Sequence, residues 1–367
     1  MINQIKKVIT VFILINTCVL AKGQSSENNV TNEDIKAKVI KMPKYTIADF
    51  PKKSLPISDI QVIQFIRDSV RLGYALKGIA NQVAQIQPEK PLTSFLQQHV
   101  LKMYKNDFKK GGMKMLWVLK ELRIGERINF GQYSYLKFKA DSYISSTDHR
   151  YNLVYNIDTV FVTPSGGDVT AWHGQEIEDA LKIILKASFR KAQDLNNGSA
   201  DFDLEEITRL SKPELNYPIL IDTFYTEGAY KNFEEFTQNK PSIYSYKAEI
   251  FYDGKTKFIT GFTDEKEKRI NIWGVCKKGE IYKFAEKQLV PIEKEGNNFI
   301  VSHYIQKSNK RNRGLFLGGL LGGVTGTLIS LSLSEKIISV QSIPYIKKSN
   351  QQPNASLINM ETGDFSF

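Results

Sequence analysis

Cysteine and histidine are scarce in this sequence, which has two cysteines and four histidines among 367 residues. It also contains none of the short patterns that mark common catalytic and cofactor sites, namely G-x-S-x-G, H-E-x-x-H, C-x-x-C and the phosphate-binding loop. The four histidines lie far apart along the chain. We therefore expect no metal site and no cofactor, and the sequence predicts a non-enzymatic protein.

The first 23 residues have the three parts of a cleavable secretory signal. Lys6 and Lys7 precede an apolar run over residues 8–20, and the small residues that follow are of the kind that a signal peptidase recognises. The run is too short for a membrane-spanning helix, which needs about 20 residues. We predict export and a mature chain that starts at Gln24. Lipidation at Cys18 is the alternative, although the three residues before it fit lipid attachment poorly.

Disulfide bonds are excluded as the basis of the fold if the signal is removed. Only Cys276 then remains, and a single thiol cannot form a bridge within the chain. Removal of three lysines with the signal lowers the formal net charge from +11 to +8. Because 41% of the residues are hydrophobic, the chain can bury real cores by packing alone.

The spacing of apolar residues predicts an α+β fold in two parts. The first is a mostly antiparallel sheet with helices on one face, and the second is a small β-rich module that contains a glycine-rich apolar insert. The expected segments are a signal at 1–23, a flexible leader at 24–37, an α+β domain at 38–191, a connector at 192–217, a β-rich module at 218–306, the glycine-rich segment with its flanks at 307–350, and a last strand of the β-rich module at 351–367.

Local patterns predict the individual elements. Apolar residues at helical spacing follow Pro91, where Ser94 and Gln97 are expected to cap a helix, and a second helix is expected over about 175–190. Asp203 with Glu206 and Asn232 with Glu235 predict two short capped helices. Strands are expected at 60–66, 115–124, 136–144, 151–157, 243–252, 257–262, 270–276, 280–284 and 299–305.

Residues 314–334 form the longest apolar segment. These 21 uncharged residues would span about 31 Å as a helix, close to the thickness of a bilayer core. Three hypotheses stay open: a spanning helix, a membrane-inserted hairpin or oligomerising helix, and a buried helix or disordered insert of a soluble protein. A spanning helix would leave a basic cluster outside, against the usual orientation rule. Glycines at intervals of four are candidate membrane or homo-oligomer contacts: Gly318, Gly322, Gly326, Gly319 and Gly323.

Basic residues gather in two places. Between residues 97 and 140, ten lysines and arginines accompany three acidic residues. Such a surface attracts anionic lipids or cell-wall polymers, whereas a solvated surface without a ligand is the simpler alternative. Nucleic acid is not expected, because no recognition motif accompanies the charge. The candidate anionic-surface contacts, of which the first three are expected to share a helix face, are Lys102, Lys105, Lys109, Lys110, Lys310, Arg311 and Arg313.

An exported enzyme acting on glycans or peptides is the alternative function. His173 with Asp168 five residues upstream could shuttle a proton, but a histidine at a helix start is more often a cap or packing residue. Cys276 is expected to be a buried small hydrophobe. Aromatic residues of the second module suit either an exposed row that stacks on glycans or peptides, or half-buried strand positions: Tyr244, Tyr246, Phe251, Tyr252, Trp273 and Tyr282.

Two resemblances follow from these segments. The stretch from Tyr230 (YKNFEEFTQNKPSI), residues 272–282 (IWGVCKKGEIY) and residues 360–364 (METGD) resemble a family of uncharacterised exported envelope proteins of Gram-negative bacteria, over about the last 140 residues. Residues 60–190 are similar in element order to the auxiliary lipoproteins of envelope ABC transporters, with Leu72-Gly73-Tyr74 before a helix and Arg67-Asp68 in reversed order at the preceding turn. The first resemblance implies no activity.

These observations together predict a non-enzymatic exported protein in the periplasm or at the outer membrane of a Gram-negative bacterium. It is expected to bind or scaffold other envelope proteins or an anionic lipid or cell-wall surface, with residues 314–334 as its candidate membrane contact.

Overall fold

The computed structural model describes residues 36–44, 56–77, 82–129, 131–145, 149–193, 201–253, 256–301 and 353–367. Residues 1–35 and 302–352 lie outside the described residues, so the predicted signal, the glycines at 318–326 and the basic residues Lys310, Arg311 and Arg313 are not placed. The α+β class is confirmed, because helices pack on a large sheet and the C-terminal part is rich in strands.

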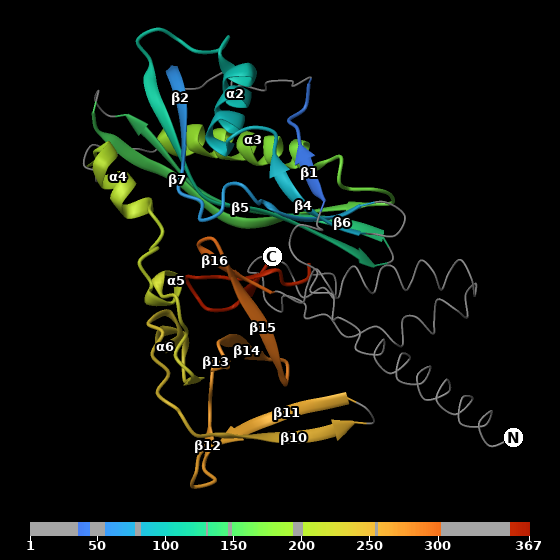
Figure 1. Ribbon diagram of the computed structural model, residues 1–367. Coiled ribbons are helices and arrows are strands. Elements are labelled where there is room, and N and C mark those ends of the chain that lie inside the picture. The colour runs from blue at the N-terminus through green and yellow to red at the C-terminus, as the bar shows by residue number, and fades with distance from the viewer. Residues whose placement is uncertain are drawn as a thin grey trace, which may run out of the picture. The chain divides into compact units, whose positions relative to one another are not determined.

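An eight-stranded sheet forms the first part of the fold (Figure 1). Its order is β1-β4-β3-β5-β6-β7-β8, and β2 also pairs with β5. The three long strands β5, β6 and β7 are antiparallel as predicted, whereas β1–β4, β2–β5 and β3–β5 are parallel pairs. The strands are β1 (Ala37–Ile40), β2 (Ile57–Gln64), β3 (Gly73–Lys77), β4 (Gln82–Pro88), β5 (Met113–Asn129), β6 (Gly131–Ser145), β7 (Tyr151–Ser165) and β8 (Asp201–Phe202).

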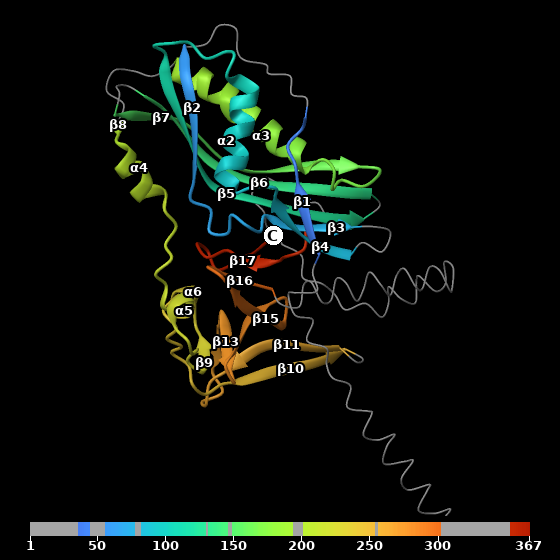
Figure 2. The same ribbon diagram turned by 45° about the horizontal axis from the view of Figure 1, so that its top comes forward.

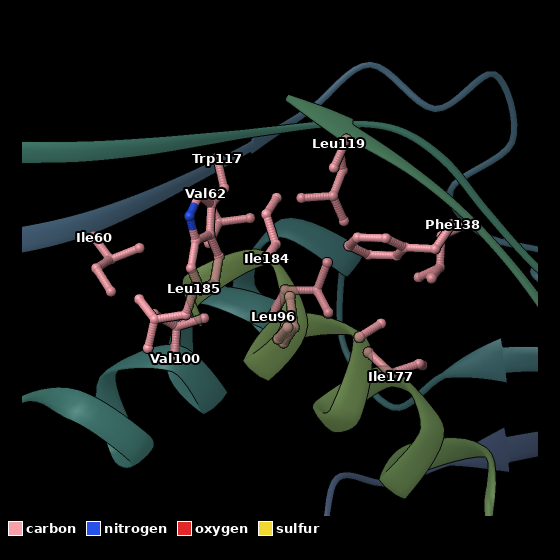
Figure 3. Packing of buried hydrophobic residues seen from close by; sticks show 14 of the residues in the cluster. Ile60, Val62, Leu96, Val100, Trp117, Leu119, Phe138, Ile177, Ile184 and Leu185 are labelled. Carbon is pink, nitrogen blue, oxygen red and sulfur yellow. The ribbon is translucent and has the colours of Figure 1, made fainter. Parts of the chain in front are cut away.

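Two helices, α2 (Leu92–Tyr104) and α3 (His173–Ala192), cover one face of this sheet (Figures 1 and 2). Alternate residues of β5, among them Trp117 and Leu119, point toward them and are fully buried. Figure 3 shows how side chains of β2, β5 and β6 meet Leu96 of α2 and Ile184 of α3 in one core. This packing explains the helical spacing of apolar residues in both segments.

The opposite face of the same sheet also buries apolar residues. Leu116, Val118 and Tyr143 form a second cluster with Ile207 of α4 (Leu204–Ser211). Asp203 caps α4 in the predicted capping box with Glu206. The prediction placed helices on one face of the sheet only and missed that α4 packs on the other face. β5 buries alternate residues on both of its sides, so both faces need a cover.

The C-terminal part contains a seven-stranded sheet with the order β18-β17-β16-β15-β14-β13-β9. Its core stacks Phe236 on Trp273, with ring centroids 4.3 Å apart and Phe299 packed against Phe236. Its elements are α5 (Pro218–Ile221), β9 (Gly228–Tyr230), α6 (Phe233–Thr237), β13 (Gly274–Lys277), β14 (Glu280–Ala285), β15 (Gln288–Glu295), β16 (Asn298–Ile300), β17 (Leu357–Ile358) and β18 (Phe365–Ser366). Asn232 caps α6 as predicted.

A separate three-stranded sheet, β10-β11-β12, inserts between α6 and β13. Its strands are β10 (Lys247–Asp253), β11 (Thr256–Thr263) and β12 (Arg269–Ile270). Phe262 of β11 packs against Val275 and Ala229 of the seven-stranded sheet. The amide of Ile259 also donates to the carbonyl of Lys287, 2.8 Å away. These contacts attach one face of the small sheet to the seven-stranded sheet.

Several local predictions are wrong. Ser94 does not cap α2, which begins directly after Pro91 without a side-chain cap, and Gln97 instead binds the backbone of Ile60 and Val62 in β2. The strand expected at 270–276 is divided into β12 and β13, and β1, β3, β4, β8, β9 and β15 were not predicted. The domain boundaries remain predictions. Among the described helices, none combines the length and apolar content that crossing a membrane requires.

Candidate functional site

The free edge of β10 is the most exposed apolar feature of the small sheet. Among the described strands, β10 is an outer strand that pairs with β11 alone (Figures 1 and 2). Ile250, Phe251 and Tyr252 follow one another along it and are 44%, 58% and 63% exposed. We call these three residues the β10 edge. Exposed edge strands normally carry charges or prolines at such positions, so this continuous apolar run is a candidate contact surface.

Only one face of β10 packs against the seven-stranded sheet. Ala248 lies opposite Phe262 and belongs to the face that packs on the seven-stranded sheet, as do Ile250 and Tyr252 by the strand alternation. Phe251 and Glu249 lie on the other face. Ile259, opposite Ile250 in β11, still belongs to the buried cluster, but Ile250 and Tyr252 do not, so apolar side chains are exposed on both faces of the β10 edge.

Because Gly261 of β11 has no side chain, the charged side chains of Glu249 in β10 and Arg269 in β12 can both lie over it. A Cβ atom at Gly261 would lie 2.8 Å from Oε2 of Glu249 and 3.0 Å from Nε of Arg269. The β10–β11 register shifts between Glu249 and Ile250, where β11 supplies the extra residue Thr260. Since the irregularity lies in β11, β10 itself keeps regular strand alternation along its free edge.

The six predicted aromatic residues divide into two groups. Tyr244, Phe251 and Tyr252 are well exposed, whereas Tyr246, Trp273 and Tyr282 pack against buried clusters. Half-buried strand positions are thus confirmed for three of the six residues, and stacking of the other three on glycans or peptides stays a prediction. The sequence reasoning did not single out Ile250, although an apolar residue beside Phe251 and Tyr252, at the end of the strand predicted over 243–252, was the available signal.

The predicted basic surface is exposed but is not a single helix face. Lys102, Lys105, Lys109 and Lys110 are all exposed. The helix ends at Tyr104, because the chain then turns to β2 and the amide of Lys109 donates to the carbonyl of Ile57. The ammonium of Lys102 donates to the carbonyl of Pro43, 3.0 Å away. The prediction of a shared helix face for three lysines is therefore wrong.

His173 is the centre of a buried ionisable cluster. Its Nε2 atom lies 2.6 Å from Oε1 of Glu126, and its Nδ1 atom lies 3.3 Å from Oε2 of Glu176. The Ser134 hydroxyl donates to the same Glu176 oxygen at 2.7 Å. Burial pushes the pKa of His173 down, but hydrogen bonds and charges from the two carboxylates outweigh it and raise that pKa to about 9.

This cluster resembles a catalytic arrangement only in its residue types. His173 is completely buried, and Ser134 likewise has no exposed surface. The Asp168 carboxylate accepts a hydrogen bond from the amide of Thr170, and the hydrogen bonds of His173 go to other residues. A substrate has no access to this imidazole, so the cluster acts as an ion pair that fixes the start of α3 against β5 and β6.

Lys283 of β14 is a second buried charge. Its Nζ atom lies 4.4 Å from the ring centroid of Trp273 and 5.6 Å from that of Phe365. Burial lowers the pKa of Lys283 to about 8, and the charge of Asp364 opposes this only in part. The predicted burial of Cys276 is confirmed, and burial raises the pKa of its thiol. Neither group is exposed to a reactant.

Arg123 joins β5 to the last described residues. It is buried, and its guanidinium donates to the main-chain oxygens of Phe367 and Arg71 at 3.1 and 3.0 Å. Phe367 lies over Gly125, where a Cβ atom would approach its ring to 2.8 Å. Among the described residues, no group of three or more histidine, cysteine or acidic side chains is placed to hold a metal ion.

Comparison with known proteins finds a weak structural likeness and no family match. No family model matches it, and no curated protein matches it. One solved structure that is similar to it is the protein XCC0632 from Xanthomonas campestris, of the family DUF330. The likeness covers 43% of this chain and 98% of that one, at 12% identity and a TM-score of 0.31. At that TM-score it supports no argument. The fold and site thus define an α+β protein with an exposed apolar strand edge.

Proposed function

We propose that this protein is a non-enzymatic component of the bacterial cell envelope that binds another protein through the β10 edge. The observation that carries the proposal is the exposed run of Ile250, Phe251 and Tyr252 on a strand that pairs on one side only within the part of the chain that the structure describes. An extended segment of a partner can add to such an edge through main-chain hydrogen bonds, while the apolar side chains are buried. Each side chain fully buried this way contributes roughly 1.5 to 3 kcal/mol.

Export is part of the same proposal and is supported by the charged, apolar and small-residue segments of residues 1–23. The alternative of an exported enzyme rested on Asp168 with His173 and on the aromatic strands. His173 is buried and hydrogen-bonded to two carboxylates, so it does not favour this alternative. The exposed Tyr244, Phe251 and Tyr252 suit a protein partner as well as a glycan or peptide substrate.

Site-specific cross-linking in intact cells tests the proposal. A photo-crosslinking amino acid replaces Phe251 in the full chain, and in a control chain it replaces the exposed Glu265 in the turn before β12. We expect a discrete cross-linked protein at position 251 only, and an N-terminus at Gln24 by mass spectrometry. Equal cross-linking at both positions would argue against a binding edge, and an intact Met1 in a cytosolic fraction would argue against export.

A further inference from the structure

We propose that the β10 edge pairs with the β10 edge of a second copy of this chain. The inference rests on the proposed function, since it names the partner of the same surface. The two strands would run antiparallel about a twofold axis at Ile250 and join the two three-stranded sheets into one continuous sheet. Such an isologous contact uses the same residues on both copies.

The charge pattern of β10 is complementary to itself in this register. β10 reads Lys247-Ala248-Glu249-Ile250-Phe251-Tyr252-Asp253. Antiparallel pairing about Ile250 places position 247, a lysine, opposite position 253, an aspartate, at both ends of the paired strands. Opposite charges that face each other directly across two strands stabilise the pair.

The sizes of the facing side chains also fit this register. Ile250 meets its own copy, and the small Ala248 lies opposite the large Tyr252 at both ends. These three positions share one face by the strand alternation. Phe251 lies opposite Glu249, whose carboxylate already reaches across Gly261 toward Arg269 and away from the free edge. Ile250 and Tyr252 of each copy thereby gain an apolar neighbour from the other copy, and the main-chain edge between them is paired.

Neighbouring registers are worse. Shifting one strand by two residues in one direction places Glu249 opposite Glu249 of the other copy. Shifting it by two residues in the opposite direction places Glu249 opposite position 253, an aspartate. Both put like charges face to face, which is destabilising. A shift by one residue turns the packed face of one copy to the unpacked side of the other. An acidic residue at two of the seven positions also disfavours an anionic membrane as the occupant of this edge.

Charge exchange on full-length purified protein tests the inference. Lys247→Asp places two acids opposite each other, and Asp253→Lys places two lysines opposite each other. A mixture of the two variants restores complementary pairs at both ends. Lys266→Asp makes the same charge change as Lys247→Asp at an exposed turn residue away from the edge. Sedimentation at about 100 µM measures self-association, since a single strand pair is a small interface, and circular dichroism confirms folding.

We expect a dimer for the unchanged chain and for Lys266→Asp, self-association weakened at least about tenfold for each edge variant, and recovery of a mixed dimer in the mixture. A monomeric unchanged chain, or edge variants that associate normally, would overturn the inference. Cross-linking of position 251 to a different protein, together with a monomeric chain, would overturn the second copy and leave the proposed function standing. A monomeric chain with no discrete cross-linked protein at position 251 would overturn both proposals.

Discussion

The imidazole Nε2 of His173 lies 2.6 Å from a carboxylate oxygen of Glu126, although 47 residues separate the two in sequence. The second oxygen of Glu126 accepts a hydrogen bond from the amide of Leu76 in β3. One buried carboxylate therefore ties the start of α3 to two strands of the eight-stranded sheet. The positive charge of protonated His173 compensates the negative charge of Glu126.

The protonated state of His173 predicts the pH dependence of stability. The pKa of His173 in the folded chain is about 9, above the ordinary 6.5, so its contribution is complete below about pH 6.5 and is lost as the pH rises toward 9. We expect the free energy of unfolding to fall by about 2 to 3 kcal/mol over that range.

Urea unfolding of His173→Gln and of the exposed His149→Gln across pH 6 to 9.5 measures this effect. His149→Gln should keep the slope of the unchanged chain, and His173→Gln should flatten it. An unchanged slope in His173→Gln would show that the imidazole is neutral in the folded protein.

A glycine at position 73 is required by the approach of two strands. Gly73 has a φ of +134°, and a Cβ atom there would lie 1.8 Å from the carbonyl oxygen of Ile124 in β5. Gly73→Ala should therefore lower the free energy of unfolding by about 3 kcal/mol or more. Gly167→Ala is the control, because nothing lies within 4 Å of a Cβ atom at that turn. Similar unfolding midpoints for the two variants would contradict the close approach.

Phe367 should contribute to stability as a core residue. It is 2% exposed, and its ring meets Tyr135 at 6.2 Å between centroids. Phe367→Ala is expected to cost about 3 to 5 kcal/mol. Phe224→Ala removes the same atoms from a side chain that is 85% exposed and should have little effect. Thermal unfolding compares the two, and equal midpoints would mean that Phe367 does not pack on β5 and β6 in solution.

Lys283 should oppose folding at neutral pH. Its pKa of about 8 lies below the ordinary 10.5, so the unfolded chain binds more protons between these values and stability rises with pH across them. Lys283→Met should raise the free energy of unfolding at pH 7 by about 1 kcal/mol or more, with a difference that shrinks toward pH 10.

Lys277→Met, at an exposed position of β13, controls for the loss of one surface charge. A Lys283→Met chain that is less stable than the unchanged one at pH 7 would show that the contact with the Trp273 ring outweighs the cost of burying the ammonium group.

Local features of the sequence determined much of the secondary structure. Apolar spacing predicted α2 and α3, an apolar run predicted β5, alternation predicted β6 and β7, and the capping pairs at Asp203 and Asn232 predicted α4 and α6. These signals succeed because each depends on residues a few positions apart. The prediction at Ser94 failed because Gln97 binds β2, a partner that local spacing cannot reveal.

Only the tertiary structure decided which charges are buried and which apolar residues are not. Arg123 and Phe367 are far apart in sequence, and their contact depends on how the C-terminal strands meet β5. Phe251 and Trp273 both read as aromatic strand residues, but one lies on a free edge and the other in a core. Alternation specifies the two faces of a strand, whereas the order of strands in a sheet decides which edge stays open.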